Sequence, residues 1–137
     1  MMKSSVKAFT LTELLLAAAI LAFVIAGLLM LFINCAFLNT ANRNLTVAIA
    51  HAQFAMEEIK NTTFASIGTN YNGICWNATD IQNKGLIPLD TESICFSITG
   101  SDPLNVWAGV TWKDRGVRDR NAQTGTGVVL QTYITEP

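Results

Sequence analysis

One carboxylate, that of Glu13, lies at the start of the most apolar part of this 137-residue chain. The next twenty residues, 14–33 (LLLAAAILAFVIAGLLMLFI), contain no charged side chain and none that forms hydrogen bonds. A carboxylate at membrane depth costs roughly 3 kcal/mol on insertion scales, and such residues persist where a partner neutralises them. We therefore expect Glu13 to pair with a group of opposite charge; the alternative is a carboxylate that reaches the lipid headgroups unaided.

The apolar run has the length of a membrane span. Twenty residues in helical conformation reach about 30 Å, the thickness of the hydrocarbon core of a bilayer. A buried core helix would show a polar face, and this run shows none. Lys3 and Lys7 precede it, and no acidic residue occurs before Glu13. The positive-inside rule therefore keeps the N-terminus in the cytoplasm and takes the chain from about Asn34 onward across the membrane.

Other N-terminal signals fit this sequence poorly. A signal peptide has an apolar region of about 7–15 residues followed closely by a small-x-small site. Here the run is longer, and the first A-x-A match after its end begins only at Ala48. A lipoprotein needs a small residue before its cysteine, and Cys35 follows Asn34. A plain single-span anchor explains the apolar run but leaves Glu13 unexplained.

The segment KAFTLTE, residues 7–13, with the apolar run behind it, resembles the N-terminal signal of type IV pilins and pseudopilins. In that family a prepilin peptidase removes a short basic leader, and the new N-terminal phenylalanine is N-methylated. The resemblance implies cleavage between Ala8 and Phe9 and methylation of Phe9. The family has Gly where this chain has Ala8, and we expect the peptidase to tolerate this small residue. The resemblance also implies that Glu13, the fifth mature residue, meets the amine of a neighbouring subunit during assembly.

Beyond the span, one-sided apolar spacing predicts that the helix continues. Apolar residues recur at intervals of three and four: Leu38, Ala41, Leu45, Ala48, Ala52, Ala55 and Ile59. No proline occurs before Pro88, so we expect one helix from Thr10 to about Asn61. Its amphipathic second half must lie against another element.

A sheet can be built from the rest of the chain. Three segments alternate apolar and polar residues as half-buried strands do: 93–100, 105–112 and 127–135. Turn residues at 100–103 and 113–116 favour an antiparallel meander. A helix followed by such a sheet predicts an α+β fold, the long-helix-and-sheet architecture of type IV pilins. The predicted parts are a leader (1–8), a transmembrane and assembly half of the helix (9–33), an amphipathic half (34–61) and a globular β head (62–137).

The end of the chain carries a narrower resemblance. A strand ending Val110-Thr111-Trp112, a charged turn and then L-x-T-Y-I, residues 130–134, is similar to the end of PilV-type minor pilins and GspI-type minor pseudopilins. This likeness covers about thirty residues, and its members are common strand formers.

Cysteine and histidine placement limits the chemistry of the head. Cys75 and Cys95 both lie in the part predicted to face an oxidising compartment, so a disulfide between them is expected, and Cys35 is left unpaired. One histidine, His51, and no C-x-x-C motif make a metal site improbable. We interpret His51 as a solvated or packed side chain. No catalytic set is evident, so no enzyme activity and no cofactor are predicted.

A basic loop offers a second hypothesis. Residues 113–127 hold four basic against two acidic side chains, and Arg115, Arg118 and Arg120 could contact DNA phosphates, as in competence pilins. A solvated hairpin loop is the favoured interpretation. From Thr62 onward the chain has five basic and seven acidic residues, which argues against general affinity for nucleic acid.

The sequence therefore predicts a structural subunit: a minor pilin, or a minor pseudopilin of type II secretion, that helps to start or cap a filament. Its expected partners are prepilin peptidase, the inner membrane with its assembly platform, and other pilin subunits. It would span the inner membrane once, with a periplasmic head, before entering the filament. A DNA-binding competence pilin, a major pilin and a single-span protein that never polymerises remain as alternatives.

Overall fold

The computed structural model describes residues 10–113 and 126–136. The chain divides into two compact units, one ending at Asn39 and the other beginning at Thr40. Helix α1, Leu11–Lys60, contributes its first part to one unit and its second part to the other. Its bounds lie within one residue of the predicted helix.

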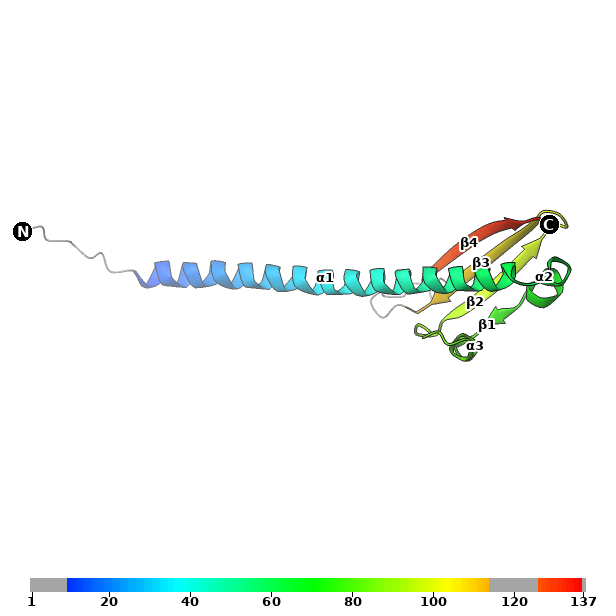
Figure 1. The fold of residues 1–137 in the computed structure, drawn as a ribbon. Coiled ribbons are helices and arrows are strands. Elements are labelled where there is room, and N and C mark those ends of the chain that lie inside the picture. Colours follow the sequence, from blue (N-terminus) through cyan, green and yellow to red (C-terminus); the bar gives the residue numbers. More distant parts are fainter. Residues whose placement is uncertain (1–9, 114–125, 137) are drawn as a thin grey trace, which may run out of the picture. The chain divides into compact units, whose positions relative to one another are not determined.

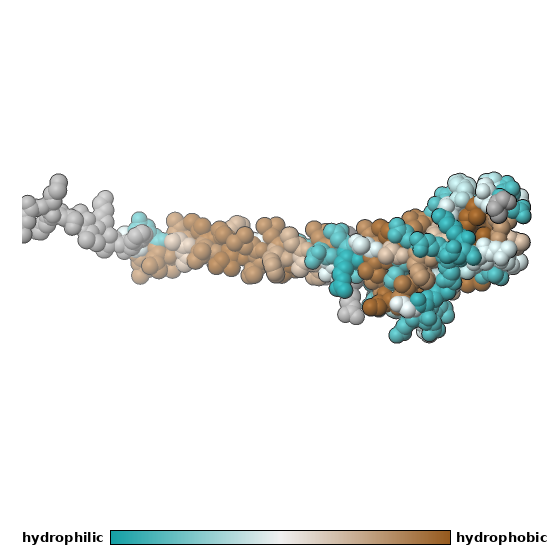
Figure 2. Space-filling model, in the orientation of Figure 1, coloured by the Kyte–Doolittle hydropathy of each residue, from teal (hydrophilic) through white to brown (hydrophobic). Residues whose placement is uncertain are grey.

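The first unit consists, among the described residues, of the apolar part of α1. Every residue from Thr10 to Thr40 is exposed, including Leu11 at 77% and Phe23 at 83%. Figure 2 shows apolar side chains over the visible surface of this segment. The helix is long and apolar enough to cross a membrane, and no residue of its most apolar 18-residue window is buried.

The second unit contains the end of α1 and a four-stranded antiparallel sheet (Figure 1). The strands lie in chain order: β1 (Cys75–Trp76), β2 (Ser93–Thr99), β3 (Leu104–Trp112) and β4 (Thr126–Ile134). Two short helices, α2 (Phe64–Tyr71) and α3 (Ala78–Asn83), flank β1 in the sequence. The predicted α+β fold is confirmed.

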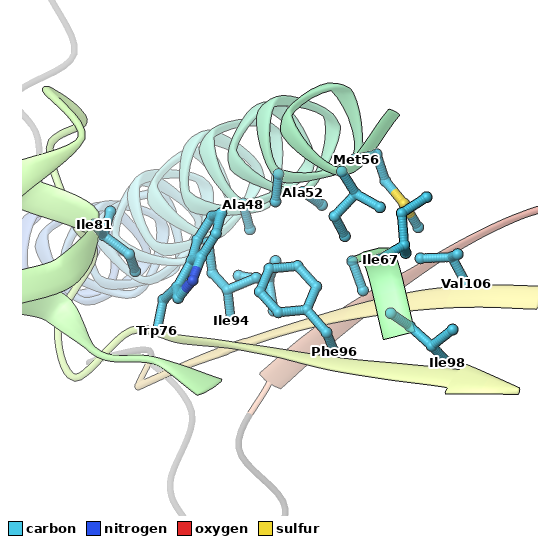
Figure 3. Close-up of a cluster of buried hydrophobic side chains, with 14 of the residues drawn as sticks. Ala48, Ala52, Met56, Ile67, Trp76, Ile81, Ile94, Phe96, Ile98 and Val106 are labelled. Atoms are coloured by element: carbon cyan, nitrogen blue, oxygen red, sulfur yellow. The ribbon is translucent and has the colours of Figure 1, made fainter. Parts of the chain in front are cut away.

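The core lies between α1 and the inner face of the sheet (Figure 3). Ala48, Ala52 and Ala55 are fully buried, and such small side chains let a helix approach a sheet closely. The sheet contributes alternate residues, as strand periodicity requires: Ile94, Phe96 and Ile98 from β2, and Leu104, Val106, Ala108, Val110 and Trp112 from β3.

Two local features differ from the sequence analysis. The apolar stripe on α1 was predicted from Leu38, but burial begins at Ala48, and Leu38 and Leu45 are 64% and 40% exposed. The elements α2, β1 and α3 were not predicted. They are short, and the two-residue β1 owes its extended form to pairing with β2 rather than to any alternating pattern of its own.

Candidate functional site

The start of α1 is organised around Glu13. Its Oε2 accepts hydrogen bonds from the Thr10 backbone N–H at 3.0 Å and from the Thr10 hydroxyl at 2.9 Å. The Glu13 backbone N–H in turn donates to Thr10; its nitrogen lies 3.1 Å from the Thr10 carbonyl oxygen and 3.4 Å from Thr10 Oγ1. Among the described residues, Oε1 of Glu13 has no hydrogen-bond partner. The carboxylate therefore has one oxygen engaged locally and one available.

This arrangement is a capping box, in which residues N-cap and N3 satisfy each other's backbone N–H groups. Thr10 is the N-cap and Glu13 is N3. The positive end of the helix dipole also stabilises a carboxylate in the first helical turn. The T-x-x-E pattern before an apolar run was visible in the sequence and marks a helix start. The sequence analysis assigned Glu13 only to pairing between subunits and missed this local role.

The apolar wall of α1 has a shallow hollow at Gly27. It measures about 440 Å³ and is lined by Phe23, Val24, Gly27, Leu28, Met30, Leu31 and Asn34. A Cβ added at Gly27 would meet no atom within 4 Å, so the missing side chain leaves room at the surface. Small residues of this kind let the backbones of membrane helices approach each other.

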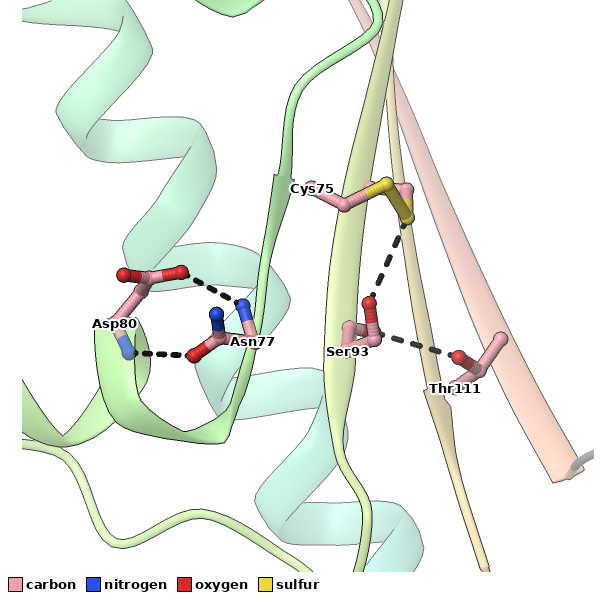
Figure 4. Close-up of a disulfide and its surroundings, with 6 residues drawn as sticks. Cys75, Asn77, Asp80, Ser93 and Thr111 are labelled. Carbon is pink, nitrogen blue, oxygen red and sulfur yellow. Dashed lines mark hydrogen bonds between the residues drawn. A yellow bond between two sulfur atoms is a disulfide. The ribbon is translucent and has the colours of Figure 1, made fainter.

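A disulfide joins Cys75 of β1 to Cys95 of β2 across directly paired positions (Figure 4). The two residues are 20 apart in sequence, and both are exposed on the outer face of the sheet. Cys35 is a free, exposed cysteine of the apolar unit. The bridge therefore fixes the edge strand β1, which otherwise has only two residues to pair.

The second unit also contains a buried histidine–glutamate contact that sequence reasoning missed. His51 Nδ1 lies 2.8 Å from Oε1 of Glu92, and the side chains are 7% and 0% exposed. The other oxygen of Glu92 accepts a 2.6 Å hydrogen bond from the Leu89 backbone N–H. The pair ties the loop before β2 to α1. No sequence signal links two residues 41 positions apart. The sequence analysis left His51 as either solvated or packed, and its side chain is packed.

Several predicted site residues lie outside the described part of the chain: Ala8, Phe9, Arg115, Arg118 and Arg120. Lys113, the last described residue before that loop, is exposed, and its backbone N–H donates to the Asp90 carbonyl oxygen. Within residues 10–113 and 126–136, no group of three or more His, Cys, Asp or Glu side chains could hold a metal ion.

The comparison with known families is confined to the start of the chain. Residues 3–29 match the prokaryotic N-terminal methylation motif. No curated protein and no solved structure matches the chain. The match supports a type IV pilin-like protein that is processed by prepilin peptidase, and it points to a structural role and a membrane anchor. It covers Ala8, Phe9, Glu13 and the hollow at Gly27 up to Leu29.

Proposed function

We propose that this chain is a minor subunit of a type IV pilus or of a type II secretion pseudopilus, acting where a filament is started or capped. The observation that carries the proposal is the methylation motif at residues 3–29 together with the apolar first part of α1, where every residue from 11 to 40 is exposed in the isolated chain.

In the proposed pathway, the inner membrane holds α1 with its N-terminus in the cytoplasm and its head in the periplasm. Prepilin peptidase cuts between Ala8 and Phe9, and Phe9 is methylated. The new amine provides the positive charge that a carboxylate in apolar surroundings requires. Because Thr10 already engages Oε2 of Glu13, Oε1 is the atom available to the amine of a neighbouring subunit.

Pairing of this kind sets the axial position of one helix against the next. Lipid tails are as apolar as leucine, so helices in a membrane gain little hydrophobic energy by associating. Close packing at sites such as the Gly27 hollow and a charged contact at Glu13 would supply the attraction and the register. Specificity for particular partners would come from the head.

Intact mass of the protein purified from its own membranes tests processing. We expect a species that starts at Phe9 and is heavier by one methyl group. A chain that retains residues 1–8, in cells with active prepilin peptidase, would mean that Ala8 blocks cleavage and that the protein is an anchor outside the filament.

Incorporation into sheared filaments tests assembly. Glu13→Gln removes the charge and keeps the shape, and we expect it to lower incorporation roughly tenfold, the equivalent of about 1.4 kcal/mol and the lower end for a hydrogen bond to a charged group. Leu16→Met, a volume-conserving change one turn away, is the control and should leave incorporation unchanged. Equal incorporation of both variants would refute the pairing.

A further inference from the structure

Strand β4 is an edge strand without the usual protection. It pairs with β3 along nine residues, and it is the last strand of the sheet (Figure 1). Natural proteins protect such edges with charged side chains, proline, bulges or very short strands. The sequence TGVVLQTYI has no charge and no proline, and its register with β3 is continuous from Trp112↔Thr126 to Leu104↔Ile134. The edge is therefore long, regular and neutral.

The hydrogen bonds of β2 show to which neighbouring strand the backbone N–H and C=O groups of each residue point. The Phe96 N–H donates to the Ile74 carbonyl oxygen at 3.0 Å, and the Phe96 carbonyl accepts from the Gly73 N–H at 3.1 Å. Both backbone groups of Phe96 thus point toward the β1 side. Because successive residues of a strand point their backbone groups to opposite sides, Cys95 points toward β3, where its partner is Gly109.

The same alternation carries across to β4. The backbone groups of Gly109 point toward β2, so those of Ala108 point toward β4. Leu130, the partner of Ala108, therefore directs its backbone groups back toward β3. The intervening residues of β4 direct their N–H and C=O groups away from the sheet: Gly127, Val129, Gln131 and Tyr133. All four residues are exposed, and the side chains of Val129, Gln131 and Tyr133 lie on the outer face. Among the described residues, no strand pairs with the N–H and C=O groups of these four alternate residues, which thus form a free edge.

A groove lies beside this edge, on the inner side of the sheet. Two hollows of about 500 and 420 Å³ share Lys60 of α1 as a lining residue. We call them together the β4 groove; their walls include Met56 and Lys60 of α1, Phe64 of α2, and Leu130, Thr132 and Ile134 of β4. The three β4 residues point inward but are only half-buried, because no further strand lies beyond β4 in the described part of the chain.

We propose that the β4 edge and the β4 groove accept one extended segment of a neighbouring subunit, which adds a fifth strand to the sheet; this rests on the proposed filament function. An extended polypeptide is the ligand whose backbone matches a row of free N–H and C=O groups. Its alternate side chains would fall into the groove, where apolar ones would meet Met56, Phe64, Leu130 and Ile134. The nine residues of β4 carry no charge. The groove is also lined by Glu57, Lys60 and Glu136, so the incoming strand must leave these side chains in contact with water or pair with them.

The size of the surface selects a single strand as the occupant. Nine residues of β4 extend about 30 Å, and the layer beside them is about 10 Å deep. The strip of roughly 300 Å² is well below the about 800 Å² per partner that a stable complex buries. The contact therefore does not hold two free heads together. It forms where other contacts, such as those of α1, already keep the subunits adjacent.

Hydrogen exchange with residue-level fragmentation tests this on two samples: the full chain in detergent micelles, and sheared filaments in which its presence has been verified. In micelles, we expect the amides of Val129, Gln131 and Tyr133 to exchange fast, and those of Val128, Leu130 and Thr132, which bond to β3, to be protected. In filaments both sets should be protected. The β3-bonded amides serve as the internal control, since folding alone protects them in either state.

A matched pair of variants adds a second measurement. Gln131→Pro removes one free N–H of the edge, whereas Gln131→Ala keeps that N–H and removes the amide that bonds Asn105 and Tyr133. We expect Gln131→Pro to reduce incorporation into filaments roughly tenfold relative to Gln131→Ala. Tryptophan fluorescence of both variants in micelles verifies that the head is folded, and if Gln131→Pro unfolds it, the exchange pattern of the wild type decides.

The outcomes separate the two proposals. Edge amides that stay unprotected in filaments containing the protein overturn strand addition and leave the filament function standing. Absence of the wild-type protein from filaments overturns the function itself. Protection of the edge already in micelles, with concentration-dependent dimers, would show a second copy as the occupant and would also overturn the proposal.

Discussion

Replacing His51 should destabilise the second unit strongly, because it leaves Glu92 as a buried, unpaired charge. The Glu92 side chain is fully buried and has two hydrogen-bonding contacts among the described residues, His51 Nδ1 at 2.8 Å and the Leu89 N–H at 2.6 Å. In His51→Leu the first contact is lost, at a site where the side chains of His51 and Glu92 are 7% and 0% exposed. Removing one partner of a buried pair costs about 3–5 kcal/mol, and we expect His51→Leu to fall in that range.

The companion variants show that the cost comes from the orphaned charge. Glu92→Leu leaves an imidazole, which can stay neutral, and frees the Leu89 N–H, so we expect a smaller loss of about 2 kcal/mol. The double variant replaces both partners by apolar groups, which is often close to neutral for buried pairs. We therefore expect the double variant to cost less than His51→Leu alone, which corresponds to a coupling of more than about 2 kcal/mol.

Urea unfolding of the full chain in mild detergent at neutral pH measures these free energies. All three tryptophans, Trp76, Trp107 and Trp112, lie in the second unit, so their fluorescence reports on that unit while the apolar helix contributes no signal. A loss below about 1 kcal/mol for His51→Leu, or single losses that add within about 0.5 kcal/mol, would refute the argument that the pair is buried and coupled.

Two further predictions concern the second unit. Cys75→Ser, or reduction of the wild type, removes a bridge between residues 20 apart and should lower the free energy of unfolding by about 3 kcal/mol in the chain-entropy model; an unchanged urea midpoint after complete reduction would contradict this. Asn77→Ala removes the capping box of α3, in which the Asn77 side chain accepts from Thr79 and Asp80 and the Asp80 carboxylate accepts from the Asn77 N–H. It should cost about 1 kcal/mol, whereas Asn77→Asp, which can still accept, should cost less in the same assay.

The parts of the fold that depend on periodicity could be predicted from the sequence. Helix α1 and strands β2, β3 and β4 each have enough residues for an apolar repeat of 3.6 or 2 to emerge, and the uncharged run at 14–33 has the length of a bilayer. The bounds of α1 followed because no proline interrupts it before Pro88. These signals are local, so one sequence is sufficient to recognise them.

The parts that depend on contacts between distant residues could not be predicted. Strand β1 exists because Cys75 and Trp76 pair with Cys95 and Ile94, and α3 has only six residues. The charge of Glu92 is accommodated by His51 from another element, which no spacing rule anticipates. The capping role of Glu13 was different, since T-x-x-E is a local pattern, but the apolar run beside it drew attention to partners in other subunits.

The two halves of α1 differ in what covers their apolar side chains. In the second unit Ala48, Ala52, Ala55 and Ile59 are buried by the chain's own sheet, so this half contributes to stability. In the first unit no side chain from Leu11 to Asn39 is buried, so lipid or other helices must cover it. Exchange of lipid for helix contacts is nearly neutral in hydrophobic energy. On the proposed function, the choice of partner therefore rests on features that lipid cannot imitate: the carboxylate of Glu13 and the backbone edge of β4.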